Sequence, residues 1–292
     1  MHDMWCFTGI CHHAGNCRKY EKRCHDCPLL GKRKSASDLS GRIQSRKANC
    51  YSRDRLHFIA VSHWLADLAR KSTLLSDMPL SVIPNAFPIE EYVARSDRDN
   101  TRPLRILFGA ARLDDPVKGL PILVRMTRHL KENYPEASQN MELITFGDVK
   151  DPSSLEGIAI KARHLGMVRE KRKLEELYRS SDIIVSTSLY ETLPGTLVEG
   201  QAYGCVPVGF NRGGQSDIID HLSTGFLARW SDNPDEAAAS IAEGIIWAAS
   251  QGEATRRRMH ESVAQRFSAR KVAEAYIRLF KKSARKFDEI LS

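Results

Sequence analysis

The sequence lacks several features that define whole classes of protein. No apolar run approaches the roughly 20 residues that a membrane-spanning helix needs, and the start, MHDMWCFTG, has no signal-peptide pattern. Neither the P-loop pattern GxxxxGK followed by Ser or Thr nor the dinucleotide pattern GxGxxG occurs. We therefore expect a cytoplasmic protein whose ligand does not occupy an ordinary ATP or NAD site.

Positive charge and cysteine are concentrated near the N-terminus. Residues 1–60 contain twelve Lys and Arg against five Asp and Glu, which accounts for nearly all of the net charge of +8. A basic segment suits nucleic acid, an anionic membrane or acidic substrates. Six of the seven cysteines lie within the first 50 residues. Without an export signal, that density predicts reduced thiols with a metal or another function.

Four of these cysteines suggest a metal site. Cys24 and Cys27 have the spacing of a zinc-ligand pair, and with Cys11 and Cys17 they would supply four thiolates for a tetrahedral ion. The five residues between Cys11 and Cys17 are more than such a pair usually has. A structural zinc site and a loop of unligated thiols are therefore equally weighted interpretations.

Residues 31–55 are basic and polar, and Leu39 and Ile43 lie four apart among them. This spacing predicts a short basic amphipathic helix. One interpretation is a helix that rests on anionic lipid headgroups at the inner face of a membrane. The more common alternative is a solvated helix that covers part of the core. Nucleic acid is not expected, because the Lys and Arg are not interleaved with aromatic residues available for stacking.

The rest of the chain predicts an α/β fold. Strands are expected at 56–61 and 80–86, with a helix capped by Ser62 between them. Further on, six strands alternate with helices, which is typical of a doubly wound parallel sheet. These six strands are expected at 104–111, 142–146, 163–167, 182–186, 206–210 and 225–228, followed by three helices from Pro234 to Ser292. We expect a first domain at 1–90, a linker at 91–103, a second domain at 104–267 and a C-terminal helix at 268–292, packing back on the N-terminal part.

The candidate site is the stretch Ser186 to Cys205, STSLYETLPGTLVEGQAYGC, directly after a buried strand. A helix that begins on Pro194-Gly195-Thr196 offers orphan N–H groups and a positive dipole end, which suit a phosphate. Arg112 and Lys118 lie six apart in another strand-to-helix loop, where they could hold the other side of one diphosphate. Taken alone, each of these two cations is more often a solvated loop charge.

These residues resemble a known family. Residues 104–230 are similar to the donor-binding half of family 4 glycosyltransferases, the retaining enzymes of GT-B fold. The segment His2 to Pro28 resembles the cysteine-rich stretch of capsule and exopolysaccharide transferases of this family, including colanic-acid types. The matching motifs are Arg-x5-Lys-Gly at 112–119, Glu-x7-Glu at Glu191 and Glu199, Asp182, Gly-Cys-Val-Pro-Val at 204–208, Gly213-Gly214, Ser62-His63-Trp64 and Ile-Pro-Asn-Ala at 83–86.

The resemblance implies an activity. A sugar would pass from a nucleotide diphosphate sugar to a glycan or lipid-linked acceptor with retention of configuration, in surface polysaccharide synthesis and without a cofactor. Arg112 and Lys118 would stabilise the departing diphosphate, and Glu191 and Glu199 would bind donor-sugar and ribose hydroxyls. His2 would lie near the transferred sugar. The implied donor-binding residues are Gly147, Met167, Glu191, Thr192, Leu193, Pro194, Gly195, Thr196, Leu197 and Glu199.

One departure from the family pattern affects the expected activity. The family's acceptor half normally has a long stretch before the His-Asp-Met-Trp motif, and here that motif begins at His2. We therefore expect a complete C-terminal Rossmann-like donor domain, a truncated N-terminal acceptor domain, and no robust turnover by the chain alone. Either a truncated reading frame, or a fragment that needs a partner to supply the missing half, would explain this pattern. The alternative is a non-catalytic, nucleotide-sugar-binding or zinc-bearing basic interaction module.

Overall fold

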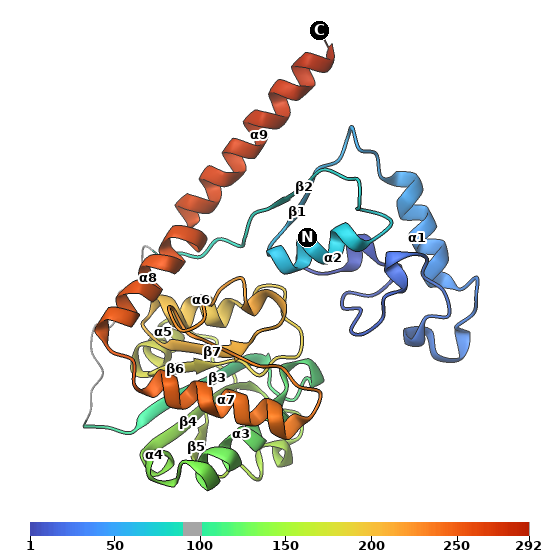
Figure 1. Cartoon of the computed structure of the whole chain (residues 1–292). Coiled ribbons are helices and arrows are strands. Elements are labelled where there is room, and N and C mark those ends of the chain that lie inside the picture. The colour runs from blue at the N-terminus through green and yellow to red at the C-terminus, as the bar shows by residue number, and fades with distance from the viewer. Residues whose placement is uncertain (90–100, 292) are drawn as a thin grey trace. The chain divides into compact units, whose positions relative to one another are not determined.

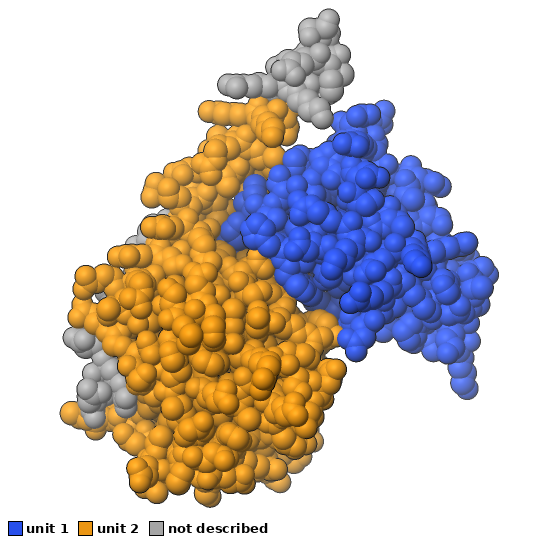
Figure 2. All heavy atoms as spheres, in the orientation of Figure 1, with its two compact units in different colours: residues 1–85 blue, residues 86–292 orange. Residues whose placement is uncertain are grey.

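The computed structural model describes residues 1–89 and 101–291, with side chains up to Ala284. The chain divides into two compact units, Met1–Asn85 and Ala86–Ser292 (Figures 1 and 2). Most of the predicted linker, residues 91–103, lies outside the described residues. No helix in the described ranges is both long and apolar enough to span a membrane.

The first unit contains a small parallel sheet and two helices. Strand β1 pairs with β2, with Phe58 opposite Leu80. Helix α2 follows β1, and the Ser62 hydroxyl caps it by accepting from the Leu65 N–H at 3.2 Å, as the sequence predicts. The elements of this unit are η1 (Trp5–Phe7), η2 (Lys19–Glu21), η3 (Pro28–Arg33), α1 (Leu39–Cys50), β1 (Phe58–Ala60), α2 (His63–Lys71) and β2 (Leu80–Val82).

Helix α1 is the predicted basic helix, but it buries a polar face. Leu39 is 44% exposed, whereas Gln44 and Lys47 are buried. The Lys47 ammonium donates to the carbonyl oxygens of Thr8 at 3.0 Å and Gly9 at 3.2 Å. The irregular N-terminal segment offers carbonyl groups that a regular element would have paired internally, and a buried lysine satisfies them. Leu39 is therefore not part of the face that α1 buries.

The second unit is built on one parallel sheet with the strand order β5-β4-β3-β6-β7-β8. Counted within the unit this order is 3-2-1-4-5-6, that of the Rossmann fold. The predicted six-stranded α/β sheet is confirmed. Its strands are β3 (Leu104–Arg112), β4 (Met141–Asp148), β5 (Lys161–His164), β6 (Ile183–Val185), β7 (Val206–Phe210) and β8 (Phe226–Ala228).

Helices cover both faces of this sheet (Figure 1). Helices α3 and α7 pack together on one face, and α6 packs with α8 on the other, as right-handed crossovers on either side of β3 and β6 require. Apolar side chains of the strands and of α3 and α7 form the core between the layers. The helical elements are α3 (Leu120–Asn133), α4 (Pro135–Gln139), α5 (Lys171–Ser180), α6 (Gly195–Ala202), α7 (Pro234–Ala249), α8 (Glu253–Phe267), α9 (Ala269–Leu291) and the short turns η5 (Pro116–Lys118), η6 (Pro152–Leu155) and η7 (Gly213–Gln215).

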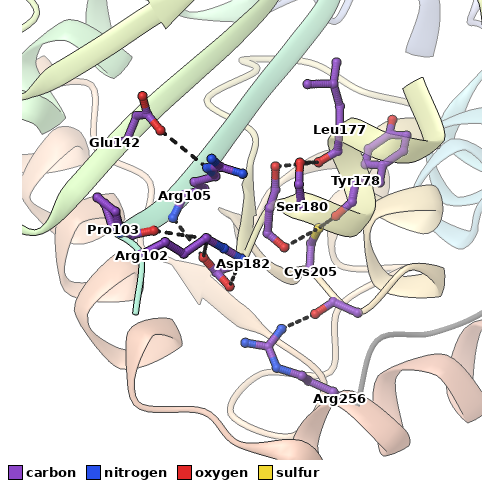
Figure 3. Close-up of polar contacts among 12 residues, drawn as sticks. Arg102, Pro103, Arg105, Glu142, Leu177, Tyr178, Ser180, Asp182, Cys205 and Arg256 are labelled. Carbon is purple, nitrogen blue, oxygen red and sulfur yellow. Dashed lines mark hydrogen bonds and ion pairs between the residues drawn. The ribbon is translucent and has the colours of Figure 1, made fainter. Parts of the chain in front are cut away.

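A buried carboxylate joins the two central strands at their amino ends. The Asp182 side chain, just before β6, is fully buried and accepts from both ends of the Arg102 guanidinium, at 2.8 and 3.1 Å (Figure 3). It also accepts from the Arg105 N–H of β3 at 2.9 Å. This bidentate pair is the strong, orienting form of an ion pair. It fixes β6 against β3, and so fixes the loops at the opposite ends of both strands.

Candidate functional site

A cleft of about 190 Å³ opens in the second unit at the carboxyl ends of β3 and β6. The strand order reverses between these two strands, and ligands of doubly wound sheets bind at that position. The cleft belongs entirely to residues after 107. Its walls are Phe108, Gly109, Ala110, Ala111, Lys118, Val185, Ser186, Ser188, Glu191, Leu193, Pro194, Gly195 and Thr196.

Helix α6 presents its N-terminus to the cleft. Pro194 is the N-cap residue and makes no side-chain cap. The Leu197 N–H bonds to the Pro194 carbonyl oxygen at 3.1 Å, so it is already used. No partner of the Gly195 or Thr196 N–H is present among the described residues, and both residues line the cleft. Two free N–H groups at a helix start suit an anionic oxygen.

Lys118 and Glu191 form an ion pair in the cleft wall. The Lys118 Nζ lies 2.6 Å from the Glu191 Oε1, and their side chains are only 29% and 17% exposed. Lys118 ends η5 after β3, and Glu191 lies in the loop between β6 and α6. The structure thus brings together two residues that are 73 positions apart and that the sequence assigned to one site.

The loop that carries Glu191 is held by two glycines. The Gly214 N–H donates to the Glu191 carbonyl oxygen at 2.7 Å. Gly213 has a φ of +67°, and a Cβ atom on it would lie 2.7 Å from the same oxygen. A Cβ atom on Gly214 would lie 1.9 Å from the Thr192 carbonyl oxygen. Both positions therefore require glycine for the loop to keep its course.

Arg112 does not line the cleft. Its Nε lies 3.1 Å from the Asp114 Oδ1, but the two atoms lack hydrogen-bond geometry, and both are buried without a hydrogen-bond partner among the described residues. Burial acts to raise the pKa of Asp114. The N–H groups of Lys150 and Asp151 and the nearby guanidinium nevertheless hold this pKa below its usual value. The predicted grip of Arg112 and Lys118 on one diphosphate stays a prediction.

Glu199 lies one helical turn beyond Gly195 and Thr196, on the same side of α6. Its Oε2 accepts from the Tyr178 hydroxyl of α5 at 2.8 Å. Burial raises the pKa of Glu199, although the Tyr178 hydrogen bond acts in the opposite direction. The sequence did not indicate Tyr178, because a tyrosine on an amphipathic helix is usually a core residue.

Four other predicted donor residues, Gly147, Met167, Thr192 and Leu197, do not line the cleft. Gly147 is the last but one residue of β4, and its N–H bonds to the Gly166 carbonyl oxygen at 2.9 Å. Met167 follows and is 44% exposed, outside the cleft wall. The Leu197 side chain is fully buried, so it contributes to the core. Thr192 supplies the carbonyl oxygen beside Gly214.

A buried glutamine that the sequence did not single out braces the same loops. The Gln215 Oε1 accepts from the Phe210 N–H at 3.2 Å, and its Nε2 donates to the Ser188 carbonyl oxygen at 3.2 Å. It therefore connects the end of β7 to the cleft wall. Its position directly after Gly213-Gly214 is the only feature of the sequence that could have pointed to this role.

His2 belongs to the first unit and is exposed. The neighbouring Asp3 Oδ2 lies 2.7 Å from the His12 Nδ1. The assignment of His2 to the transferred sugar is not supported or opposed by these contacts, and it stays a prediction.

The four cysteines of the zinc hypothesis border one small cavity of about 20 Å³, with Tyr20 and His25. Within residues 1–89 and 101–291, no three His, Cys, Asp or Glu side chains converge closely enough to hold one metal ion. Burial raises the pKa of the Cys11 and Cys24 thiols. The structural zinc site stays a prediction.

Comparison with known proteins identifies the family. The family model described as Glycosyl transferases group 1 matches residues 93–266, which is more than half of the chain. The chain belongs to this family. Among solved structures, a glycosyltransferase from Rickettsia africae is 18% identical and superposes with a TM-score of 0.63, covering 78% of this chain and 63% of that one. The Anabaena protein HepE, solved with UDP and glucose, is 19% identical with a TM-score of 0.62, covering 82% of this chain and 66% of its own. These structures confirm the GT-B-like α/β fold.

The curated relatives are longer than the part of them that this chain matches. D-inositol 3-phosphate glycosyltransferase of Corynebacterium jeikeium is 26% identical over 176 residues, 55% of this chain and 42% of that protein. The amylovoran biosynthesis glycosyltransferase AmsD of Erwinia amylovora is 32% identical over 100 residues, 32% of this chain and 28% of that protein. This chain therefore aligns with less than half of each of these two relatives.

Proposed function

We propose that this protein transfers a sugar from a nucleotide diphosphate sugar to a glycan or lipid-linked acceptor, with retention of configuration, in surface polysaccharide synthesis. The observation that carries the proposal is the Lys118–Glu191 pair beside the bare N-terminus of α6, at the switch point of a Rossmann-like sheet. Family membership supports the reaction class. The names of AmsD and of the putative glycosyltransferase EpsF of Bacillus subtilis support the polysaccharide pathway.

The cleft suits both parts of such a donor. A diphosphate carries its charge on oxygens that the Gly195 and Thr196 N–H groups and the Lys118 ammonium can bind. Glu191 can accept hydrogen bonds from sugar hydroxyls, which a phosphate cannot donate. The acceptor hydroxyl oxygen bonds to the anomeric carbon as the bond to the diphosphate breaks, and the hydroxyl proton passes to the leaving phosphate oxygen. Negative charge grows on that oxygen before it takes the proton. The fixed cations and N–H groups stabilise that charge in place of a metal ion.

Arg112 supplies a second cation in this proposal. Its buried Nε lacks a hydrogen-bond partner beside Asp114, among the residues that the structure describes. A diphosphate in the cleft would offer the guanidinium two oxygens in the paired arrangement that arginine prefers. We infer that Arg112 turns from Asp114 toward the donor when the donor binds.

The first unit provides a surface for a membrane-held acceptor. Leu29 is 66% exposed in η3, and the exposed residues Lys32, Arg33 and Lys34 follow within five positions. An exposed apolar side chain near three cations is typical of a protein surface that binds anionic lipid headgroups peripherally. We include such a contact at the inner face of the membrane in the proposed function.

Nucleotide binding and sugar transfer should be measured separately. A panel of nucleotide diphosphate sugars is screened by thermal unfolding, because a ligand that binds only the folded state raises the midpoint. We expect one donor to stabilise the chain, and Lys118→Ala to remove that shift. Lys173→Ala is the matched control, since Lys173 pairs with Glu170 on the exposed side of α5.

The two outcomes that oppose the proposal are distinct. If no nucleotide diphosphate or its sugar stabilises the wild-type chain, the donor site is refuted. If a donor binds but no acceptor is glycosylated, the chain is a nucleotide-sugar-binding module whose turnover needs a partner.

A further inference from the structure

The Glu199 carboxylate has one oxygen that is hydrogen-bonded to another side chain, and one that has no such partner among the described residues. Its Oε2 accepts from the Tyr178 hydroxyl at 2.8 Å. No other side-chain partner of Glu199 occurs among the residues that the structure describes. The residue is half-buried and lies one turn from Gly195 and Thr196, which line the cleft. A half-buried carboxylate with an unused oxygen near an anion site is suited to a ligand that donates hydrogen bonds.

Tyr178 is itself held rigidly. It is buried, and its ring stacks on Tyr203 with centroids 5.7 Å apart and planes at 7°. The Phe146 ring of β4 meets it edge-on at 6.5 Å. Its carbonyl oxygen accepts from the Cys205 thiol at 3.0 Å (Figure 3). The phenol hydroxyl therefore holds a defined position, and the carboxylate that it bonds is positioned with it.

We propose that Tyr178 is a positioning residue that makes the site selective for ribonucleotides: its hydroxyl fixes Oε2 of Glu199 and leaves Oε1 for the 2′ and 3′ hydroxyls of a ribose. This inference rests on the proposed function, because it requires a nucleotide diphosphate in the cleft. A carboxylate fixed in this way accepts hydrogen bonds from two neighbouring hydroxyls without first changing its own conformation. A deoxyribose leaves part of the buried acceptor unpaired, and sites of this kind discriminate strongly against a missing hydroxyl.

Removing the Tyr178 hydroxyl has a specific effect on Glu199. Burial already acts to raise the pKa of Glu199, and the phenol is the group that opposes that effect. Without it, the carboxyl group is freer to rotate and gains less from remaining ionised. Both changes weaken the hydrogen bonds from the ribose hydroxyls to Glu199, whereas the phosphate contacts of α6 and Lys118 are unaffected.

The test compares a ribonucleotide with its deoxy analogue. Binding of UDP and 2′-deoxy-UDP to the full chain is measured by calorimetry, because UDP occurs in a solved structure of the same fold. If UDP does not bind, the nucleoside diphosphate that best stabilises the chain replaces it. We expect the wild type to prefer the ribonucleotide by about tenfold or more. In Tyr178→Phe, this preference should fall to within about threefold while the deoxy analogue binds nearly as before.

Two further variants keep the test decisive. Tyr203→Phe removes a hydroxyl from the other ring of the stacked pair and should keep the wild-type preference. In a Glu199→Gln background, Tyr178→Phe should change the preference no further, since the two residues act as one unit. Melting temperatures establish that each variant is folded.

Two results would overturn the inference while leaving the proposed function intact. One is an unchanged ribose preference in Tyr178→Phe. The other is an equal loss of affinity for both nucleotides, which would mean that Tyr178 supports only the fold. A wild-type chain that binds no nucleoside diphosphate would instead refute the proposed function itself.

Discussion

Lys118 and Glu191 neutralise each other across 2.6 Å at the wall of the cleft. Under the proposed function, a diphosphate that enters would have to compete with this carboxylate for the ammonium group. The competition would lower affinity for the nucleotide alone, and a sugar whose hydroxyls bond to Glu191 would restore it. At the scale of single residues, the proposal therefore expects the pair to favour the complete donor over the nucleotide product.

The variant Glu191→Gln separates these two effects. Releasing Lys118 from its carboxylate should leave nucleoside diphosphate binding equal or several-fold tighter, while sugar transfer should fall by about 100-fold or more. Calorimetry gives the first quantity and product formation the second. Glu170→Gln, which breaks an exposed ion pair with Lys173 at 2.8 Å, is the control and should change neither. Weaker binding of the nucleotide by Glu191→Gln would contradict this account.

At the scale of elements, main-chain contacts join the short helical turn η7 to the loop before α6. The Gly213-Gly214 pair contacts the carbonyl oxygens of Glu191 and Thr192, and Gln215 bonds to Ser188. The geometry of the cleft is therefore set by main-chain contacts between two loops. Substitutions in η7 reach the site without touching a ligand.

Gly214→Ala tests this coupling. The added methyl group would lie 1.9 Å from the Thr192 carbonyl oxygen, so the loop must shift. We expect a loss of about 1–3 kcal/mol in unfolding free energy and a clear loss of nucleotide affinity. Gly252→Ala is the matched control, because no atom lies within 4 Å of its added methyl group and its φ is −102°. If the two variants bind equally well, the loops are not coupled in this way.

The start of α1 predicts a dependence on pH. Hydrogen bonds from the Ser40 hydroxyl and the Cys27 N–H hold the pKa of Asp38 well below its usual value of about 3.9. A lowered folded pKa means that the stabilisation is fully present above about pH 4 and is lost as the pH falls through the folded pKa. Asp38→Asn should therefore lower the unfolding midpoint at pH 7, and its difference from the wild type should shrink below about pH 4.

Thermal unfolding followed by circular dichroism from pH 3 to 7 measures that difference. Asp67→Asn is the control, because its carboxylate lies 68% exposed on α2, where it pairs only loosely with Arg70 at 3.7 Å. It should give a small effect at every pH. A difference for Asp38→Asn that stays constant down to pH 3 would show that the carboxylate is not the capping group.

At the scale of the whole chain, elements with a strong period were predictable. The run Val206–Phe210 became β7 with its predicted bounds, because β-branched residues bounded by glycines and polar loops favour a buried parallel strand. The Glu191–Glu199 spacing placed one carboxylate before α6 and one on it. Helix periodicity and strand order together located the cleft, since both follow from patterns along the chain.

What could not be predicted depends on where side chains point. Arg112 ends β3 beside the expected loop, yet its guanidinium faces Asp114. Lys47 is buried in α1 because distant carbonyl groups need a donor, and no local pattern reports such a need. Tyr178 acquires its significance only through contact with Glu199, 21 positions away. Sequence spacing cannot supply contacts made across the fold.

The single thiol of the second unit has a consequence for chemical labelling. Cys205 is fully buried, and its hydrogen atom is donated to the Tyr178 carbonyl oxygen. Cys50, by contrast, is exposed on the first unit. An alkylating reagent therefore reaches Cys205 only when the sheet opens, but it reaches Cys50 in the native state. The rate at which Cys205 is alkylated therefore reports how often the second unit opens around the Tyr178 carbonyl oxygen.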